Sequence, residues 1–229
     1  MKILALIPAR GGSKRLPGKN VKLLGGKPLI NWSIESASGI PQICDILVST
    51  DDVTIAAVAR EAGAFVPWLR PEELATDEAT SIDVALHALN WYESNRGSVD
   101  GLLLLQPTSP FRSKETILKG IELFEKFAHK PVVSVSTSQS HPMWTFKQEG
   151  NFIVPFMDQH KLSTRSQELP SAYSPNGVLY LASPLHLRNE RSFVGLSPIP
   201  QYISSLKEAI DIDSRIDFEF AIHMLDKDL

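Results

Sequence analysis

Short apolar runs alternate with amphipathic stretches along most of the chain. The apolar runs have the length and the bounding turn residues of buried parallel strands, and they cover residues 3–8, 44–48, 65–68, 101–105, 132–135 and 177–182. Apolar positions at helical spacing, such as Ile30, Ile34 and Ala37, predict helices over 28–38, 53–62, 82–92, 114–127 and 215–225. This order predicts an α/β fold with a doubly wound, Rossmann-like, mostly parallel sheet.

The pattern changes between residues 137 and 174, where strands are short and helical periodicity is missing. Gly150 and Asn151 form a turn signal between two short apolar segments, which predicts a hairpin. We expect an excursion from the sheet that exposes apolar side chains, namely Met143, Trp144, Phe152 and Phe156. Exposed apolar surface is unfavourable alone, so this excursion predicts contact with a partner.

Length and charge narrow the function classes. A chain of 229 residues can bury a sizeable core, and we expect one domain over 1–229 with the excursion at about 137–174. The net charge of −3 predicts no nucleic-acid partner. The apolar runs are too short for a signal peptide or a membrane span, so we expect neither. The single cysteine, Cys44, excludes an internal disulfide, fits a reducing cytoplasm and is expected to be a small buried side chain.

A basic loop with several glycines follows the first predicted strand. Its cations and small residues are Arg10, Gly11, Gly12, Ser13, Lys14, Arg15, Gly18 and Lys19. The first 34 residues carry cations but no acid, because Glu35 is the first acidic residue of the chain. Cations crowded in this way repel one another unless an anion lies among them. The spacing matches neither a Walker loop nor GxGxxG. The loop therefore predicts a polyanion site of its own type, with a solvated turn as the alternative.

Polar side chains also follow the most apolar run, in the segment QPTSPFR. Ligands of open α/β sheets gather outside the carboxyl ends of central strands. Gln106, Thr108 and Ser109 should therefore face the same crevice as the basic loop. The alternative is a hydroxyl-rich loop whose Ser113 caps the following helix.

Several other polar residues have structural explanations when each is taken alone. Ser81 fits the N-cap of the helix predicted from residue 82, although a helix N-terminus also suits a phosphate or a ribose. Arg70 reads as a surface arginine. Asn176 with Gly177 is typical of a turn, and Tyr180 is typical of a strand.

Residues 210–213 alternate strictly between isoleucine and aspartate. On a strand this pattern places both carboxylates on one face, with Cα atoms roughly 6–7 Å apart. A bound Mg²⁺ would relieve their repulsion, because Mg²⁺ prefers hard oxygen ligands. Asp211 and Asp213 are therefore the candidate metal ligands. The alternative is a solvated Asp211 and a last helix capped by Asp213 or Ser214.

Five segments, taken in order, resemble one family across nearly the whole chain. They are IPARGGSKRLPGKN, LRPEELATDEATS, QPTSPFR, SPNGVLY and IDID, and together they resemble the signatures of the acylneuraminate cytidylyltransferases. The resemblance implies transfer of CMP from CTP to the anomeric hydroxyl of a nonulosonic acid, an acidic keto-sugar, with release of pyrophosphate. It also implies Mg²⁺ as cofactor and a cytoplasmic homodimer that uses the excursion as its contact.

The resemblance assigns roles to the matching residues. It implies nucleotide binding by Arg10, Ser13, Lys14, Lys19, Asn20, Arg70 and Ser81. It implies acceptor binding by Gln106, Thr108, Ser109, Arg165, Asn176, Tyr180 and Phe193, the last also suited to the core. The implied catalytic set is Arg10 and Lys19 with the metal ligands Asp211 and Asp213. Such catalysis rests on positioning and electrostatics.

Two details leave alternatives open. Ser166 follows Arg165 where related enzymes often carry a second basic residue, which bears on binding of the sugar carboxylate. Arg15 gives the first loop an SxRLPGK form that resembles the Kdo-activating enzymes, although QPTSP is not their pattern. A Kdo cytidylyltransferase is thus the near alternative, and a non-catalytic nucleotide-binding regulator on the same fold is the other. The motifs leave neuraminic, legionaminic and pseudaminic acid open as acceptors.

Overall fold

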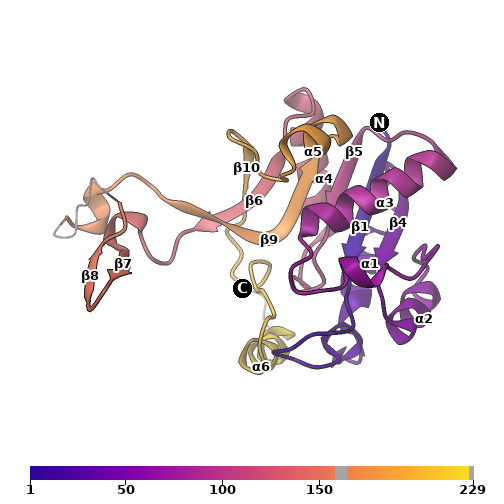
Figure 1. Cartoon of the computed structure of the whole chain (residues 1–229), viewed down its shortest axis with the longest axis horizontal. Coiled ribbons are helices and arrows are strands. Elements are labelled where there is room, and N and C mark those ends of the chain that lie inside the picture. Colours follow the sequence, from indigo (N-terminus) through magenta and orange to yellow (C-terminus); the bar gives the residue numbers. More distant parts are fainter. Residues whose placement is uncertain (158–163, 227–229) are drawn as a thin grey trace.

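The computed structural model describes residues 1–157 and 164–226. Its main sheet contains β1 (Ile3–Pro8), β4 (Ile43–Ser49), β5 (Gly101–Leu104), β6 (Val132–Thr137), β9 (Tyr173–Ala182) and β10 (Ile199–Tyr202). The strand order is β10-β6-β9-β5-β1-β4 (Figure 1). β9 runs antiparallel to both neighbours, and the other pairs are parallel. The predicted α/β class with a mostly parallel sheet is confirmed.

The described residues form six α-helices, of which five lie between strands in the chain and α6 follows the last strand. They are α1 (Leu29–Ala37), α2 (Val53–Glu61), α3 (Ser81–Arg96), α4 (Lys114–Lys126), α5 (Pro184–Glu190) and α6 (Arg215–Met224). Short 3₁₀ turns and two-residue strands add η1 (Lys19–Val21), β2 (Leu23–Leu24), β3 (Lys27–Pro28), η2 (Glu72–Leu74), η3 (Pro142–Trp144) and η4 (Ser166–Glu168).

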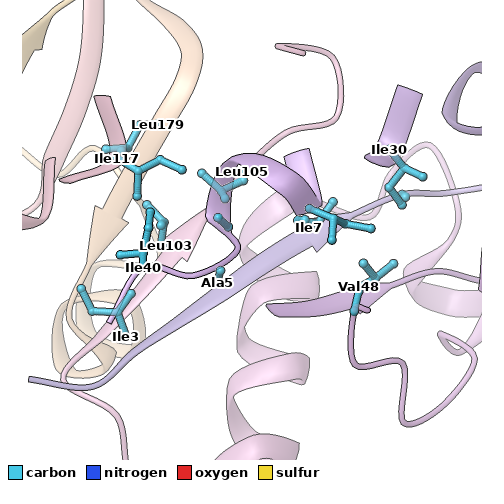
Figure 2. Close-up of a cluster of buried hydrophobic side chains, with 14 of the residues drawn as sticks. Ile3, Ala5, Ile7, Ile30, Ile40, Val48, Leu103, Leu105, Ile117 and Leu179 are labelled. Atoms are coloured by element: carbon cyan, nitrogen blue, oxygen red, sulfur yellow. The ribbon is translucent and has the colours of Figure 1, made fainter. Parts of the chain in front are cut away.

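Side chains of β1 pack on both faces of the sheet. Ile3, Ala5 and Ile7 join the cluster covered by α1, α2 and α4, part of which Figure 2 shows. Leu4 and Leu6 join a second cluster, covered by α3 and α5. All five side chains are fully buried, which explains why the strand is a continuous apolar run and not an alternating one. Helices on both faces confirm the doubly wound arrangement.

Capping side chains start five of the six described α-helices, with one shift from expectation. The carboxylate of Asp52 accepts backbone N–H bonds at the start of α2, and the hydroxyl of Ser113 does so at the start of α4. α3 is capped by Thr80 and not by Ser81. The Thr80 hydroxyl accepts the N–H of Asp83, whose carboxylate in turn accepts the N–H of Thr80. The predicted cap was therefore wrong by one residue, because this reciprocal box requires an acid three positions after the cap.

Two predicted strands do not form as strands. Residues 65–68 make only a single bridge, between Phe65 and Leu47 of β4. Residues 210–213 join no sheet, and the N–H of Ile212 donates to the carbonyl of Thr108 at 2.8 Å. A strand needs a neighbour along its length, which periodicity alone cannot reveal.

The excursion forms a separate small hairpin. Its strands are β7 (Phe146–Glu149) and β8 (Phe152–Pro155), which pair antiparallel around Gly150 at φ +60°. Glycine accepts this left-handed conformation without a Cβ clash. Figure 1 shows the hairpin projecting far from the main sheet at the end of the long β9 arm. The expected hairpin is thus present.

Exposure differs from expectation at three residues. Phe152 and Phe156 are exposed as predicted, whereas Met143 and Trp144, which belong to the 3₁₀ turn η3, are half-buried. Cys44 is exposed because β4 is an edge strand of the sheet. In the described part of the chain, no helix combines the length and the apolar composition that crossing a membrane requires.

Candidate active site

A cleft of about 570 Å³ opens where β1 and β5 end. Pro8 at the end of β1 and Pro107 after β5 both lie in its wall, as expected for the carboxyl edge of such a sheet. The predicted site residues in the wall are Arg10, Ser13, Lys14, Lys19, Asn20, Arg70, Ser81, Gln106, Thr108 and Asp213. The basic loop and the QPTSPFR segment therefore face one crevice.

Polar side chains behind the basic loop fix its shape. The Asn20 amide, 5% exposed, donates to the carbonyl oxygen of Arg10 at 3.0 Å. The N–H of Gly11 donates to the Asp51 carboxylate at 3.0 Å, and a Cβ on Gly11 would lie 2.8 Å from the Asp52 carboxylate. Asn20 and Asp51 thus hold the loop, and glycine is required where the loop passes Asp52.

An acidic side chain, Asp77, lies among the cations of the loop. Its carboxylate is 2.8 Å from Nη1 of Arg10 and also pairs with Lys14. Hydrogen bonds from Lys14 and Arg10 lower the pKa of Asp77. Sequence reasoning missed Asp77, although the crowding of cations implied that an anionic group would accompany them. Arg15, which was also given no role, lines the cleft as well.

The two ends of the chain meet at a second carboxylate. Nζ of Lys19 lies 2.8 Å from the carbonyl oxygen of Ile212 and 3.3 Å from Oδ1 of Asp213. Nη2 of Arg15 lies 3.1 Å from Oδ2 of the same carboxylate. The basic loop is therefore joined directly to residues 212 and 213.

Residues 210–213 form no strand, but their side chains still alternate between the core and its outside. Ile210 and Ile212 are buried in a third cluster with α6, so Asp211 and Asp213 lie outside it. Protein atoms around the carboxylate raise the pKa of Asp211, and the charge of Asp213 raises it further, while a hydrogen bond from Thr108 acts in the opposite direction. Asp213 lines the cleft. Asp211 lies beside it, next to Thr108.

Arg70 is a buried arginine and not a surface residue. It is 6% exposed, its Nε donates to the Ser49 hydroxyl at 3.0 Å, and its Nη2 donates to the Ser49 carbonyl. Burial lowers the pKa of Arg70 to about 10, while the charge of Asp51 raises it and that of Arg10 lowers it. Arg70 therefore ties the end of β4 to the cleft wall.

The expected acceptor residues form a patch beside the cleft. A Cβ on Gly177, at φ +78°, would lie 2.9 Å from Oε1 of Gln106 and 3.4 Å from Oγ of Ser109. The Ser109 hydroxyl is buried and has no hydrogen-bond partner among the described residues. The Asn176 amide donates to the Ser136 hydroxyl at 2.9 Å. Asn176 and Gly177 therefore act as more than a surface turn, because they bring β9 against the QPTSPFR segment.

The remaining expected acceptor residues differ in their surroundings. The ring of Tyr180 is 6.2 Å from that of Phe193, which is buried in the core cluster under α3. Burial raises the pKa of Tyr180, and the nearby charge of Asp211 adds to the effect. Arg165 is exposed and is not in the cleft wall. Tyr180 thus lies near the patch, Phe193 packs in the core and Arg165 is outside.

Metal ligation by protein side chains alone has no ready-made site in the described ranges. No group of three or more His, Cys, Asp or Glu side chains in 1–157 and 164–226 is arranged to hold an ion. Asp211 and Asp213 form a pair, which suits a metal that takes its remaining ligands from substrate and water.

Sequence comparison identifies the family. The model of the family described as Cytidylyltransferase matches residues 4–197. The chain belongs to this cytidylyltransferase family. The match covers the basic loop, the QPTSPFR segment and β9, and it confirms the family expected from the motifs.

Relatives of this cytidylyltransferase include enzymes named for three different acids. A CMP-N,N'-diacetyllegionaminic acid synthase of Legionella pneumophila is 44% identical, over 95% of this chain and 94% of that protein. A pseudaminic acid cytidylyltransferase of Campylobacter jejuni is 34% identical, over 96% and 95%. An N-acylneuraminate cytidylyltransferase of Escherichia coli is 36% identical over 99% of this chain, which spans about half (52%) of that relative. The chain is a nucleotidyltransferase of the acylneuraminate cytidylyltransferase kind.

A solved structure shares the fold. The structure of a CMP:2-keto-3-deoxy-manno-octonic acid synthetase complexed with CTP superposes over 100% of both chains with a TM-score of 0.74 and 17% identity. At this identity the similarity shows the fold alone.

Proposed function

We propose that this cytidylyltransferase transfers CMP from CTP to the anomeric hydroxyl of a nonulosonic acid and releases pyrophosphate. The observation that carries the proposal is the convergence of the cationic loop with Asp213 in the wall of one cleft. Full-length relatives named for legionaminic and pseudaminic acid activation support it.

The triphosphate belongs among the loop cations. Arg10, Lys14 and Lys19 surround the cleft and would bind phosphate oxygens, each charge-assisted bond contributing roughly 1.5–3 kcal/mol. Phosphate would replace Asp77 at Arg10 and Lys14. The proposed nucleotide-binding set is Arg10, Ser13, Lys14, Lys19, Asn20, Arg70 and Ser81.

The chemistry of Asp211 and Asp213 fits Mg²⁺. Both carboxylates are on the side of the segment away from the buried isoleucines, and the surrounding protein atoms together with the charge of Asp213 raise the pKa of Asp211. A bound divalent cation would favour the charged form of both carboxylates. We propose that the two aspartates hold Mg²⁺, which when bound would act as a Lewis acid on phosphate oxygens.

The acceptor would lie against the patch next to the cleft. The proposed acceptor set is Gln106, Thr108, Ser109, Asn176 and Tyr180, with Arg165 and Phe193 as outer members. Gln106 and the unpartnered hydroxyl of Ser109 offer hydrogen bonds toward a sugar. Arg165 is exposed within the excursion and is not in the cleft wall, so we propose that it acts on the neighbouring subunit's site.

The reaction places demands on position and charge and not on covalent catalysis. The anomeric oxygen forms a bond to the α-phosphorus of CTP while the bond to the pyrophosphate oxygen breaks, and the hydroxyl proton is released. Negative charge grows on the leaving group, where Arg10 and Lys19 would stabilise it. Gln106 would align the acceptor behind the phosphorus.

Assembly and location complete the proposal. We propose a homodimer with the excursion as its contact, which the exposed apolar side chains of Phe152, Ile153 and Phe156 support. The catalytic domain would span 1–229, and the enzyme would work in the cytoplasm, where CTP is available.

A panel assay tests the function. The full chain, CTP and Mg²⁺ are mixed with each of N,N'-diacetyllegionaminic, N-acetylneuraminic, pseudaminic and Kdo acids, and pyrophosphate is measured. We expect release that depends on a nine-carbon acid, with the legionaminic acid first because the synthase for it is the more similar relative at 44% against 34–36%. Turnover of Kdo alone would overturn the nonulosonic assignment. CTP binding without turnover of any sugar would indicate a regulator.

A further inference from the structure

Arg112 is a buried cation behind the cleft that the reaction described above does not use. It ends the QPTSPFR segment, is 3% exposed and is not in the cleft wall. Its guanidinium donates to the carbonyl of Gln106 at 3.1 Å, to the hydroxyl of Ser33 at 3.2 Å and to the carbonyl of Val178. All three partners are neutral.

Burying the charged guanidinium of Arg112 costs free energy unless hydrogen bonds to defined partners compensate for the lost water. Burial lowers the pKa of Arg112 to about 9, while the charge of Glu208 acts in the opposite direction. An apolar side chain would fill a purely structural position at lower cost. The planar guanidinium instead presents donors in several directions at once, which suits the joining of separate backbone segments.

One of these segments is a part of β9 that lacks regular strand pairing. β5 ends at Leu104, which pairs with Tyr180, so Val178 lies beyond the β5 ladder. On the other side, the register between β6 and β9 shifts after Val133. The carbonyl of Val178 is taken by Arg112, and its N–H is taken by the Asn176 side chain at 3.2 Å. Side chains thus replace a strand as the support of residues 176–178.

The other segment carries Gln106. Arg112 holds the Gln106 carbonyl, and the Ser33 hydroxyl also donates to it at 3.4 Å. The Gln106 side chain points from there into the cleft wall and past Gly177. One guanidinium therefore sets the distance between the two segments that carry Gln106 and Asn176.

We propose that Arg112 is a positioning residue for the acceptor sugar, acting through Gln106 and residues 176–178 and not on CTP. The inference rests on the proposed function, because the acceptor patch is defined there. Arg112 does not touch substrate. Removing the Arg112 side chain should therefore weaken the alignment of the acceptor sugar, while the basic loop still binds the nucleotide.

The test compares acceptor and nucleotide parameters in one assay. In Arg112→Ala we expect the KM for the nine-carbon acid to rise at least about tenfold, with the KM for CTP within about twofold of the wild type. Millimolar guanidinium or ethylguanidinium should partly restore the acceptor KM. Arg112→Lys should not restore it, because an ammonium cannot span the three partners.

Two further variants separate positioning from stability. Phe124→Leu perturbs the core where Phe124 packs at Gly101, at the opposite end of β5, and should lower Tm without raising the acceptor KM. Ser33→Ala removes, from outside the cleft, one Arg112 bond and the longer bond from Ser33 to the Gln106 carbonyl, both part of the same support, and should raise the acceptor KM about two- to threefold even if Arg112→Ala does not fold.

The outcomes distinguish the two proposals. A wild-type enzyme that turns over no nine-carbon acid refutes the proposed function. With an active wild type, equal increases in both KM values refute positioning by Arg112. An acceptor effect of Phe124→Leu at matched Tm loss, or guanidinium rescue of Tm without rescue of the acceptor KM, refutes it as well.

Discussion

Nζ of Lys19 lies 3.3 Å from Oδ1 of Asp213, a residue 194 positions later in the chain. The Lys19 side chain is only 11% exposed, whereas that of Asp213 is 41% exposed, so the ammonium is largely out of water while the carboxylate remains open to solvent in the cleft. The contact joins the loop after the first strand to the segment before the last helix. The ammonium of Lys19, proposed to stabilise the leaving group, and the carboxylate of Asp213, proposed to bind the metal, therefore lie next to each other.

Replacing Asp213 by asparagine should remove most turnover. The variant loses a proposed metal ligand and the counter-charge of Lys19, and we expect kcat to fall about 100-fold with CTP, acceptor and excess Mg²⁺. Pyrophosphate release measures the effect. Glu219→Gln, an exposed acid on α6 that pairs with Arg215, is the matched control and should be unaffected. Near-normal turnover in Asp213→Asn would remove the metal role.

Asp77 should compete with CTP. Because its carboxylate pairs with Arg10 and Lys14, Asp77→Asn should free both cations and lower the Kd for CTP about three- to fivefold at low salt. Calorimetry at two salt concentrations measures this, and the difference should shrink at the higher one. Glu78→Gln, the adjacent exposed acid, is the control. Weaker CTP binding in Asp77→Asn would show that Asp77 supports the site.

Thr80 and Ser81 should separate capping from ligand binding. Thr80→Ala removes the N-cap of α3, which typically costs about 1 kcal/mol, and should lower Tm by about 2–4 °C with little change in the KM for CTP. Ser81→Ala keeps the cap and should raise the KM for CTP several-fold at unchanged Tm. A reversal of the two effects would assign nucleotide contact to Thr80.

Gly177 should be needed for acceptor binding and not only for its backbone conformation. Gly177→Ala brings a methyl group to within 2.9 Å of Oε1 of Gln106, so we expect the acceptor KM to rise about tenfold. Gly150→Ala is a matched control, because Gly150 has a similar positive φ (+60°) but open space at its Cβ position. Both variants should lose about 1 kcal/mol of stability. Equal kinetic effects would contradict a specific contact.

Asp211 should make stability depend on pH. Its raised pKa means that the folded chain binds this proton more tightly than the unfolded chain. The contribution to stability is therefore lost as pH rises from about 3.9 through the folded pKa. Asp211→Asn removes this loss, so its Tm should exceed that of the wild type by a few degrees at pH 7 but not at pH 4, without Mg²⁺. A Tm difference between Asp211→Asn and the wild type that stays constant from pH 4 to pH 7 would contradict the role of Asp211 in this pH dependence.

Much of the fold follows from local pattern. β1 and the hairpin turn at Gly150 lie where periodicity and glycine placed them, because a buried apolar run and a tight turn depend mainly on neighbouring residues. Asp52 and Ser113 cap the predicted helices for the same reason. The motifs also indicated the family, which the match over residues 4–197 confirms.

Only the tertiary structure decided which distant groups meet. The sequence by itself determined that cations crowd after the first strand and that isoleucine and aspartate alternate near the end. It could not determine that Asp77 forms an ion pair with Arg10, or that Lys19 forms one with Asp213. The burial of Arg112 was equally hidden, because all of these contacts depend on how segments far apart in the chain pack together. Charge is visible in the sequence of residues, but its partners and its burial are set by the folded chain.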